Sequence, residues 1–255
     1  MRSVCALLLA SLAPAAIASS DCRYTADRAA AISLAGAKRI VILAEAGSLR
    51  VAGQPGLAEV RASGTACSPE RELLDDIRLT ATRSGADIRI EATTPEGTGL
   101  FPWSHGARLD FSVSVPAELP IVVEDDSGPI RIENVAAAVV DDDSGEIDIR
   151  NVRGDVTIRD DSGSIRVVGV GGMVHVEDDD SGEIEIERAG AVRIDDDDSG
   201  SIDIRDIRGD VTIRADGSGS IDVRNVGGSF TVERDGSGGI EYENVRGRVR
   251  IPEKD

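Results

Sequence analysis

The second half of the chain repeats a segment of about 18 residues, and this period limits the possible folds more than any other feature. Each copy contains the dipeptide Ser-Gly, and this dipeptide recurs at a nearly constant spacing. Such a period is typical of solenoids, in which every copy forms one coil and packs on its two neighbours. The seven serines of these dipeptides are Ser127, Ser144, Ser162, Ser181, Ser199, Ser218 and Ser237.

Within each copy, apolar residues alternate with polar ones over two short segments. In the second copy the apolar residues are Ile147, Ile149, Val152, Val156 and Ile158. A period of two indicates β-strands. One copy is too short to bury its own apolar side chains, so each strand must stack on its counterpart in the next copy. The sequence therefore predicts an all-β fold, a single-stranded parallel β-solenoid (β-helix) that is right-handed by the crossover rule and has about 18–19 residues per coil.

The corners of the coils are predicted from glycine. One corner is the Ser-Gly dipeptide, and the other is the segment NVRGD or a variant of it, with glycine at Gly154, Gly209, Gly228 and Gly247. We expect glycine to supply a positive φ at both corners.

Outward positions of the stacked coils carry charges of both signs. Because matching positions form columns, arginines and acids from adjacent coils should lie diagonally within reach of one another. The first column is Arg131, Asp148, Arg166, Glu185, Asp203, Asp222 and Glu241, and the second is Glu133, Arg150, Val168, Glu187, Arg205, Arg224 and Glu243.

The chain divides into four parts. Residues 1–18 have Arg2, an apolar run and the small-residue site Ala16-Ile17-Ala18, which together predict a secretory signal peptide. Residues 19–120 should form irregular N-terminal β coils, with one short helix near 69–77 that has Ser68 as N-cap and Pro69 at its first position. Residues 121–251 should form the regular solenoid, and residues 252–255 a charged tail.

The cysteines and the leader predict a location outside the cytoplasm. Cys5 lies in the leader, which leaves Cys22 and Cys67 as a pair. In an oxidising compartment such a pair is expected to form a disulfide. No transmembrane span is expected in the mature protein, and we predict a periplasmic or secreted protein of the bacterial envelope.

The charge balance limits the partners. The formal net charge is −19, and lysine occurs only at Lys38 and Lys254. Nucleic acid is therefore not expected as a partner, because phosphate binding requires a surplus of lysine and arginine. Cations and cationic surfaces stay compatible with so acidic a chain.

The repeated SGxIxI..VxGxVxI coils behind a signal peptide resemble the bacterial adhesin-like β-solenoid family, a domain of unknown function. The resemblance covers most of the mature chain. It implies an envelope or secreted location and no established chemistry. The corners depart from the family pattern, because this chain has acids where small polar residues are more common.

The acidic corners form two predicted columns. Two residues before each Ser-Gly serine there is always an aspartate, and the next position is also aspartate in the first five copies. The first column is Asp125, Asp142, Asp160, Asp179, Asp197, Asp216 and Asp235, and the second is Asp126, Asp143, Asp161, Asp180 and Asp198.

Two interpretations of these columns stay open. In the structural one, the first aspartate accepts backbone N–H bonds in an Asx-type corner and the second faces water. In the functional one, adjacent coils share Ca²⁺, which takes several oxygen ligands. Counting by twos from Ile158 turns Asp160 inward, where an unpaired charge is costly. No cofactor is required for folding. The candidate metal ligands are Asp125, Asp142, Asp143, Asp160, Asp161, Asp179, Asp180, Asp197 and Asp198.

The sequence predicts a protein that is not an enzyme. The corner serines lie outside any nucleophile motif, and neither His105 nor His175 is placed to activate one. We expect an adhesin-like interaction or structural module that contacts an envelope or surface macromolecule, with Phe101, Trp103 and His105 as a candidate binding loop. The alternative is a Ca²⁺-binding envelope protein that uses its stacked aspartates.

Overall fold

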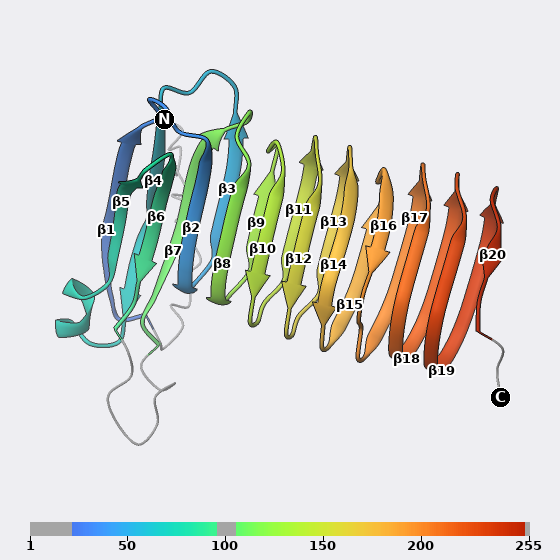
Figure 1. Ribbon diagram of the computed structural model, residues 1–255. Helices are drawn as coiled ribbons and strands as arrows, with labels where there is room; N and C mark the ends of the chain where they lie inside the picture. Colours follow the sequence, from blue (N-terminus) through green and yellow to red (C-terminus); the bar gives the residue numbers. More distant parts are fainter. Residues whose placement is uncertain (1–21, 96–105, 253–255) are drawn as a thin grey trace, which may run out of the picture.

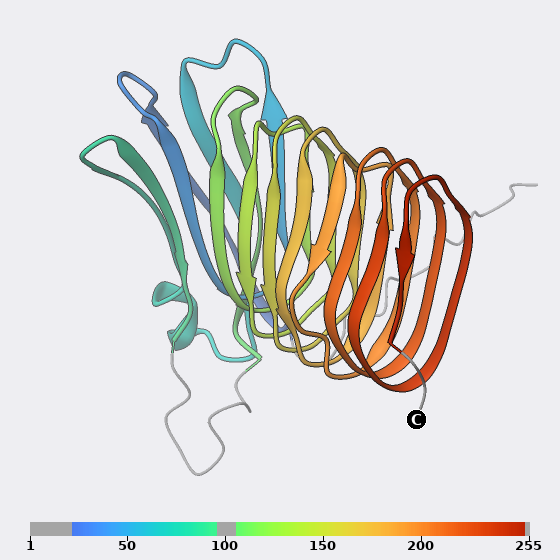
Figure 2. The same cartoon turned by 45° about the vertical axis from the view of Figure 1, so that its right-hand side comes forward.

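The computed structural model describes residues 22–95 and 106–252 of the chain. Its strands form one sheet that winds into a solenoid (Figure 1). Seen obliquely, the coils are flattened ovals stacked in a row (Figure 2). This confirms the prediction of an all-β parallel solenoid.

Each coil contributes one strand to each of two faces, whose strands run in opposite directions (Figure 1). Face 1 contains β3 (Leu49–Gln54), β9 (Ile130–Glu133), β11 (Ile147–Val152), β13 (Ile165–Val170), β15 (Gly182–Glu187), β17 (Gly200–Ile207) and the second halves of β18 (Val211–Val226) and β19 (Phe230–Val245). Face 2 contains β2 (Arg39–Ala46), β8 (Ile121–Ser127), β10 (Ala138–Asp142), β12 (Val156–Asp160), β14 (Met173–Asp179), β16 (Ala191–Ile194), β20 (Val249–Arg250) and the first halves of β18 and β19.

Matching positions of successive coils are in register. Ile147 pairs with Ile130 on one side and with Ile165 on the other, and the same register continues along face 1. These isoleucines are almost completely buried between the two faces. On face 2 the register shifts once, after Ile158, where β14 has one extra residue. The aliphatic side chains thus form continuous files in a thin core.

The N-terminal region adds antiparallel strands to both faces. On face 1, β7 (Arg108–Pro116) pairs parallel with β3 and antiparallel with β4 (Glu59–Ser68), which pairs with β1 (Tyr24–Ser33). On face 2, β6 (Asp87–Thr93) pairs parallel with β2 and antiparallel with β5 (Arg78–Ser84). The sequence did not predict these antiparallel pairs, because alternation indicates a strand without giving its direction.

The predicted helix near 69–77 is a single 3₁₀ turn, η1 (Glu72–Asp75), preceded by Arg71. Ser68 does not cap it; its hydroxyl accepts a hydrogen bond from the N–H of Glu70. The guanidinium of Arg28 binds the carbonyl oxygens of Leu74 and Ile77 at 2.5 and 2.7 Å. Because these carbonyls are engaged from outside the segment, they do not continue a helical ladder.

The two corners use glycine for different reasons. At the Ser-Gly corner the prediction of positive φ is correct, as at Gly182 with φ of 150°. At the other corner it is wrong. Gly154 is instead required for space, because a Cβ there would lie 2.9 Å from the carbonyl oxygen of Ala136. The positive φ falls three residues earlier, on Asn151, and asparagine tolerates this conformation better than most residues. The full column is Asn134, Asn151, Gly169, Arg188, Asp206, Asn225 and Asn244.

The predicted disulfide is present. It joins Cys22, just before β1, to Cys67 near the end of β4, and so ties the start of the described chain to the N-terminal strands. Among residues 22–95 and 106–252, no helix has the length and apolar character that crossing a membrane requires. The predicted signal peptide, residues 1–18, lies outside the described residues.

Candidate functional site

The first aspartate column lies inside the solenoid. Asp142, Asp160 and Asp179 are the last residues of β10, β12 and β14, and their side chains are 1% exposed. Asp142 and Asp160 point inward because each lies two residues after a buried residue of its strand, as counting from Ile158 to Asp160 predicted. Asp179 lies three residues after the buried Val176, and the extra residue of β14 brings it into register with Asp160. The buried members of the column are Asp125, Asp142, Asp160, Asp179, Asp197 and Asp216.

Within the described part of the chain, no backbone N–H group and no basic side chain donates a hydrogen bond of acceptable geometry to the carboxyl oxygens of these six buried aspartates. The carboxyl groups of Asp179, Asp197 and Asp216 lie close enough to affect one another's pKa through side-chain hydrogen bonds. The backbone N–H groups of Ser127, Ser144 and Ser162 lie near Asp125, Asp142 and Asp160 and act to lower the pKa of each, but they do not complete hydrogen bonds. The N–H groups approach from two residues further on, as in the Asx-type corner of the structural interpretation, but that corner lacks a hydrogen bond of acceptable geometry. What remains is a file of carboxyl groups in an aliphatic core.

Burial raises the pKa of every member of the file, and the charges of neighbouring aspartates add to the effect. The pKa reaches about 8 at Asp125, about 7 at Asp160 and about 7 at Asp197. It is about 6 at Asp142 and at Asp179. Asp125, Asp160 and Asp197 therefore still hold protons to a large extent at about pH 7, whereas Asp142 and Asp179 lose most of theirs above about pH 6.

The file ends differently at its two ends. Toward the N-terminus, Asp125 pairs with Ala44 of β2, and the position beyond it is Ala92 of β6. Toward the C-terminus, the pKa of Asp216 is raised to about 8 by burial and by its neighbours Asp197 and Asp235. Asp235 itself is only half-buried. The acidic core is thus confined to the regular coils.

The second aspartate column faces solvent. Asp126, Asp143, Asp161, Asp180 and Asp198 are all exposed. Corner serines hold the backbone of this column, as where Ser162 Oγ donates to the carbonyl oxygen of Asp143 at 3.3 Å. The predicted metal ligands therefore lie in two columns on opposite sides of the corner backbone, and within the described residues no three acids, histidines or cysteines converge on one metal position.

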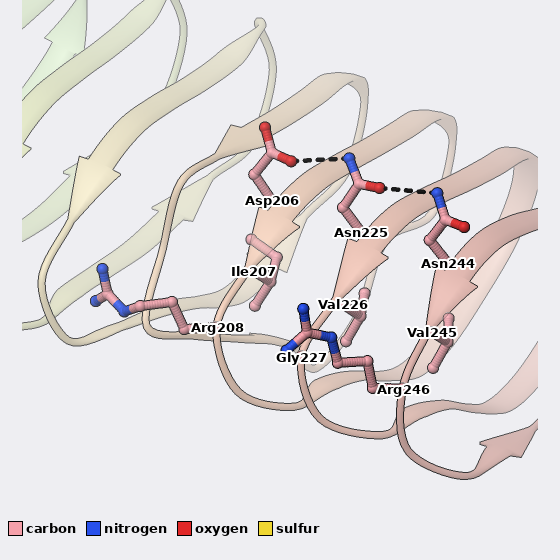
Figure 3. A pocket seen from close by; sticks show the side chains of 9 residues that line it. All are labelled: Asp206, Ile207, Arg208, Asn225, Val226, Gly227, Asn244, Val245 and Arg246. Atoms are coloured by element: carbon pink, nitrogen blue, oxygen red, sulfur yellow. Dashed lines mark hydrogen bonds between the residues drawn. The ribbon is translucent and has the colours of Figure 1, made fainter.

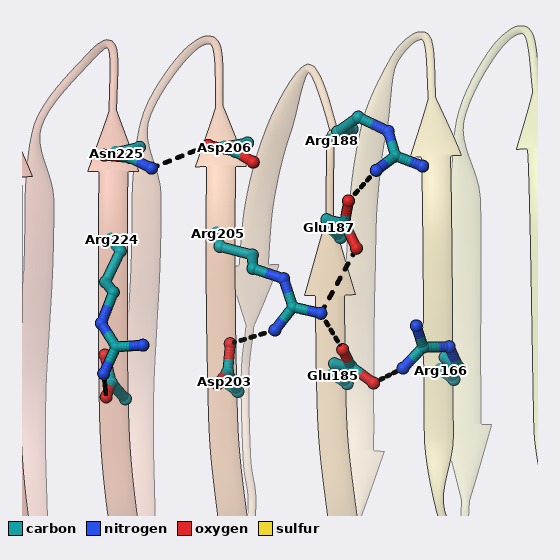
Figure 4. Close-up of polar contacts among 10 residues, drawn as sticks. Arg166, Glu185, Glu187, Arg188, Asp203, Arg205, Asp206, Arg224 and Asn225 are labelled. Atoms are coloured by element: carbon teal, nitrogen blue, oxygen red, sulfur yellow. Dashed lines mark hydrogen bonds and ion pairs between the residues drawn. The ribbon is translucent and has the colours of Figure 1, made fainter.

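Face 1 carries a network of ion pairs that crosses the coils (Figure 4). The guanidinium of Arg205 on β17 contacts Glu185 and Glu187 on β15, the latter at 3.3 Å, and Asp203 on its own strand at 3.2 Å. Glu185 also pairs with Arg166 on β13. The diagonal charge pairing predicted from the two outward columns is confirmed here. The network fixes long side chains in one layer over three successive strands.

A second ion cluster lies on face 2. Asp195, just after β16, accepts hydrogen bonds or ion pairs from His175 at 2.9 Å, Arg193 at 2.7 Å and Arg214 at 3.6 Å. Burial acts to raise the pKa of Asp195, but the His175 and Arg193 bonds outweigh it and hold this pKa below the usual range. His175 thus has a carboxylate partner where the sequence indicated only an outward position.

The corner that follows face 1 carries a ladder of amides that sequence reasoning missed. The amide of Asn225 donates to Asp206 at 2.8 Å, and that of Asn244 donates to Asn225 at 3.0 Å (Figure 3). Below this ladder is an open hollow of about 680 Å³, with Arg208 and Arg246 on its other side. Asparagine at the same place in successive repeats is the signal that could have predicted the ladder.

The candidate binding loop with Phe101, Trp103 and His105 lies outside the described residues. Its role stays a prediction.

Several solved structures resemble this fold over most of the chain. A putative adhesin from Bacteroides fragilis is 15% identical with a TM-score of 0.46, and the match covers 90% of this chain and 98% of that one. A putative lipid binding protein from Parabacteroides distasonis is 13% identical with a TM-score of 0.45, covering 91% and 98%. A putative cell adhesion protein from Clostridium sporogenes is 10% identical with a TM-score of 0.31, covering 91% and 100%.

The sequence matches no family model and no curated protein. The function must therefore be argued from the residues of this chain.

Proposed function

We propose that this protein is a non-enzymatic interaction and structural module of the bacterial envelope, in the periplasm or secreted, that binds a surface or envelope macromolecule in the manner of an adhesin. The observation that carries this proposal is the register of charged columns on the outer faces. Arg205 and its partners Glu185 and Glu187 hold one another across strands. Side chains fixed in this way lose little further entropy on binding, which suits a broad contact with a large partner.

The acidic edge gives this partner its chemistry. The exposed column of Asp126, Asp143, Asp161, Asp180 and Asp198 runs along one edge of the regular coils, in a chain with a formal net charge of −19. A row of like charges attracts a surface of opposite charge over several ångströms, and added salt weakens this attraction. We therefore expect a cationic macromolecule.

The disulfide supports a location outside the cytoplasm. Cys22 and Cys67 are bonded, and such bonds persist in oxidising compartments. The predicted signal peptide also supports a location outside the cytoplasm.

A retention assay on envelope extract tests the proposal. The immobilised protein is compared with a variant in which Asp161, Asp180 and Asp198 are replaced by Asn, and with a Trp103→Ala variant. We expect the acidic-edge variant to retain less partner, and the bound partner to be released by salt. Retention that is equal for all three proteins and insensitive to salt would exclude both the edge and the loop.

Ca²⁺ binding is the second candidate function, and the unpartnered carboxyl groups of the buried column favour it. A divalent cation between successive coils could neutralise two of them at once. Calorimetric titration with Ca²⁺ and melting with and without chelator test this, with Asp160→Asn as the informative variant and the exposed Asp161→Asn as its control. Absence of both heat and a shift in Tm would exclude a bound cation and leave protons as the neutralising species.

A further inference from the structure

The last described coil of the solenoid has another coil on one side only (Figure 2), and several of its inward apolar side chains are exposed or half-buried among the described residues. In β19, Ile240, Tyr242 and Val245 take the positions that Ile221, Val223 and Val226 hold one coil earlier. The earlier three are 0–1% exposed, whereas Tyr242 is 48% exposed, and Ile240 and Val245 are half-buried. Ile251, after β20, is 38% exposed. These apolar side chains form the terminal patch: Ile240, Tyr242, Val245, Val249 and Ile251.

The backbone at this end is also open. The second half of β19 pairs with β18, and β20 pairs with β19. Within the described residues, no strand pairs with the other edge of either one. An open strand edge offers a row of N–H and C=O groups to any strand that can lie beside it. The N-terminal end differs, because there the antiparallel strands β1 and β5 extend the two faces and contact each other.

The two rims of the open end carry opposite charges. On face 1 the outward residues of the last coil are Glu241 and Glu243, which continue the columns of Asp222 and Arg224. On face 2, Arg250 continues the column of Thr231, and Arg248 lies two residues before it. None of the four rim residues Glu241, Glu243, Arg248 and Arg250 forms an ion pair with another described residue. The end is therefore an apolar patch with an acidic rim on one side and a basic rim on the other.

We infer that the open end binds the same end of a second copy, which gives a two-fold dimer of solenoids joined end to end. The strands of face 1 and face 2 run in opposite directions (Figure 1). A two-fold rotation about an axis along the strands exchanges the two faces. It therefore sets the acidic strand of one copy antiparallel to the basic strand of the other.

Charge chooses between the two possible two-fold arrangements. The rotation about the perpendicular axis would set face 1 against face 1, with Glu243 near Glu243 and Arg250 near Arg250. Exchange of the faces instead brings Glu243 of each copy close to Arg250 of the other. Such an interface is self-complementary and closed, so it stops at two copies. Both terminal patches are covered in the same step, and the open edges pair by β-augmentation.

Sedimentation equilibrium of the purified protein over a range of concentrations tests the inference. We expect a monomer–dimer equilibrium that weakens with added salt. Glu243→Arg alone, or Arg250→Glu alone, should raise the dimer Kd by about tenfold or more. The double variant that carries both changes should restore most of the affinity, because it exchanges the charges without removing the pair.

Controls separate loss of the interface from loss of the fold. Tyr242→Lys should abolish the dimer, and because Tyr242 is already half-exposed, the circular dichroism spectrum should be unchanged. Glu183 lies on the exposed surface of a central coil, so Glu183→Arg should not change the monomer–dimer equilibrium. A monomer at every concentration, assembly beyond two copies, or a dimer indifferent to Glu243→Arg and Tyr242→Lys would each overturn the inference. None of these outcomes bears on the acidic edge, so the proposed function stands or falls separately.

Discussion

The N-terminal region and the regular coils solve the same packing problem with different residues. In the regular coils every corner repeats, and each backbone lies directly on the one before it. In the N-terminal region the strands turn back as antiparallel pairs, and the inward position occupied by aspartate in the coils is Ala44 or Ala92. The comparison teaches that stacking in register brings like groups together. The coils therefore need glycine where the backbones of adjacent coils meet, and the carboxyl groups in their core must be neutralised.

The two regions should differ most in how much a Gly→Ala substitution lowers the free energy of unfolding. In the coils, a Cβ on Gly182 would lie 1.5 Å from the carbonyl oxygen of Gly163, at a φ of 150°. In an N-terminal turn, Gly56 also has a positive φ, of 71°, but nothing lies within 4 Å. We expect Gly182→Ala to lower the free energy of unfolding by about 4 kcal/mol or more, and Gly56→Ala by about 1 kcal/mol. Urea unfolding measures both, and equal costs would contradict direct stacking of the coils.

The next largest difference should be in how strongly the stability of the folded protein depends on pH. The pKa values of the buried aspartates lie at about 6 to about 8 in the folded protein, above their usual value. Folding therefore favours the protonated form. The stability that the protons provide is complete below about pH 4, decreases as the unfolded chain loses its protons above that pH, and is fully lost once pH has risen through the folded-state pKa values of about 6 to about 8. The Tm should therefore fall between about pH 4 and about pH 8. Replacing Asp160, Asp179 and Asp197 by Asn should flatten the curve, whereas the same change at the exposed Asp161, Asp180 and Asp198 should not.

The acidic file can be extended by one residue into the N-terminal region. Ala44 pairs with Asp125 and is buried, so Ala44→Asp would add one carboxyl to the end of the file. We expect a loss of about 2 kcal/mol near pH 8 and a smaller loss near pH 5. Ala44→Asn is the matched variant, and its cost should not depend on pH. Denaturant unfolding at the two pH values measures both losses. An equal loss of unfolding free energy at both would show that the added carboxyl does not titrate with the file.

The smallest effect is expected from the ion network of face 1. Removing Arg205 leaves Glu185 with Arg166 but deprives Glu187 and Asp203 of this partner. Because these side chains are partly exposed, Arg205→Ala should cost about 1 kcal/mol or less and should cost less in high salt. Arg61→Ala, which removes an exposed pair with Glu59 in the N-terminal region, should cost less still. A loss of several kcal/mol from Arg205→Ala would mean that the network stabilises the stack and is not a surface feature.

The sequence predicted most of the regular coils because each of their constraints recurs. The alternation of apolar and polar residues predicted which side chains point inward, and the Ser-Gly period predicted the register. The inward direction of the Asp160 side chain followed because it lies two residues after Ile158. The N-terminal antiparallel pairs could not be predicted in this way, since no residue of β4 or β7 records the direction of its partner. The second corner was misassigned because Gly154 is required by close approach of another coil, which only the stacked structure reveals.

The same limit applied to the candidate site. The sequence analysis placed nine acidic corner residues, taken from both columns, in one set of candidate metal ligands. The structure divides them into a buried and an exposed column. It also gives His175 a partner, Asp195, that lies 20 residues away and one coil further on.

A carbon NMR titration of the aspartate side-chain carboxyl groups, in buffer free of divalent metal, tests whether the stacked coils hold a file of carboxyl groups inside the core. We expect the resonances of Asp125, Asp142, Asp160, Asp179, Asp197 and Asp216 to titrate between about pH 6 and about pH 8. If these six carboxyl groups instead titrated at about pH 4, the usual value for aspartate, the buried file would not exist.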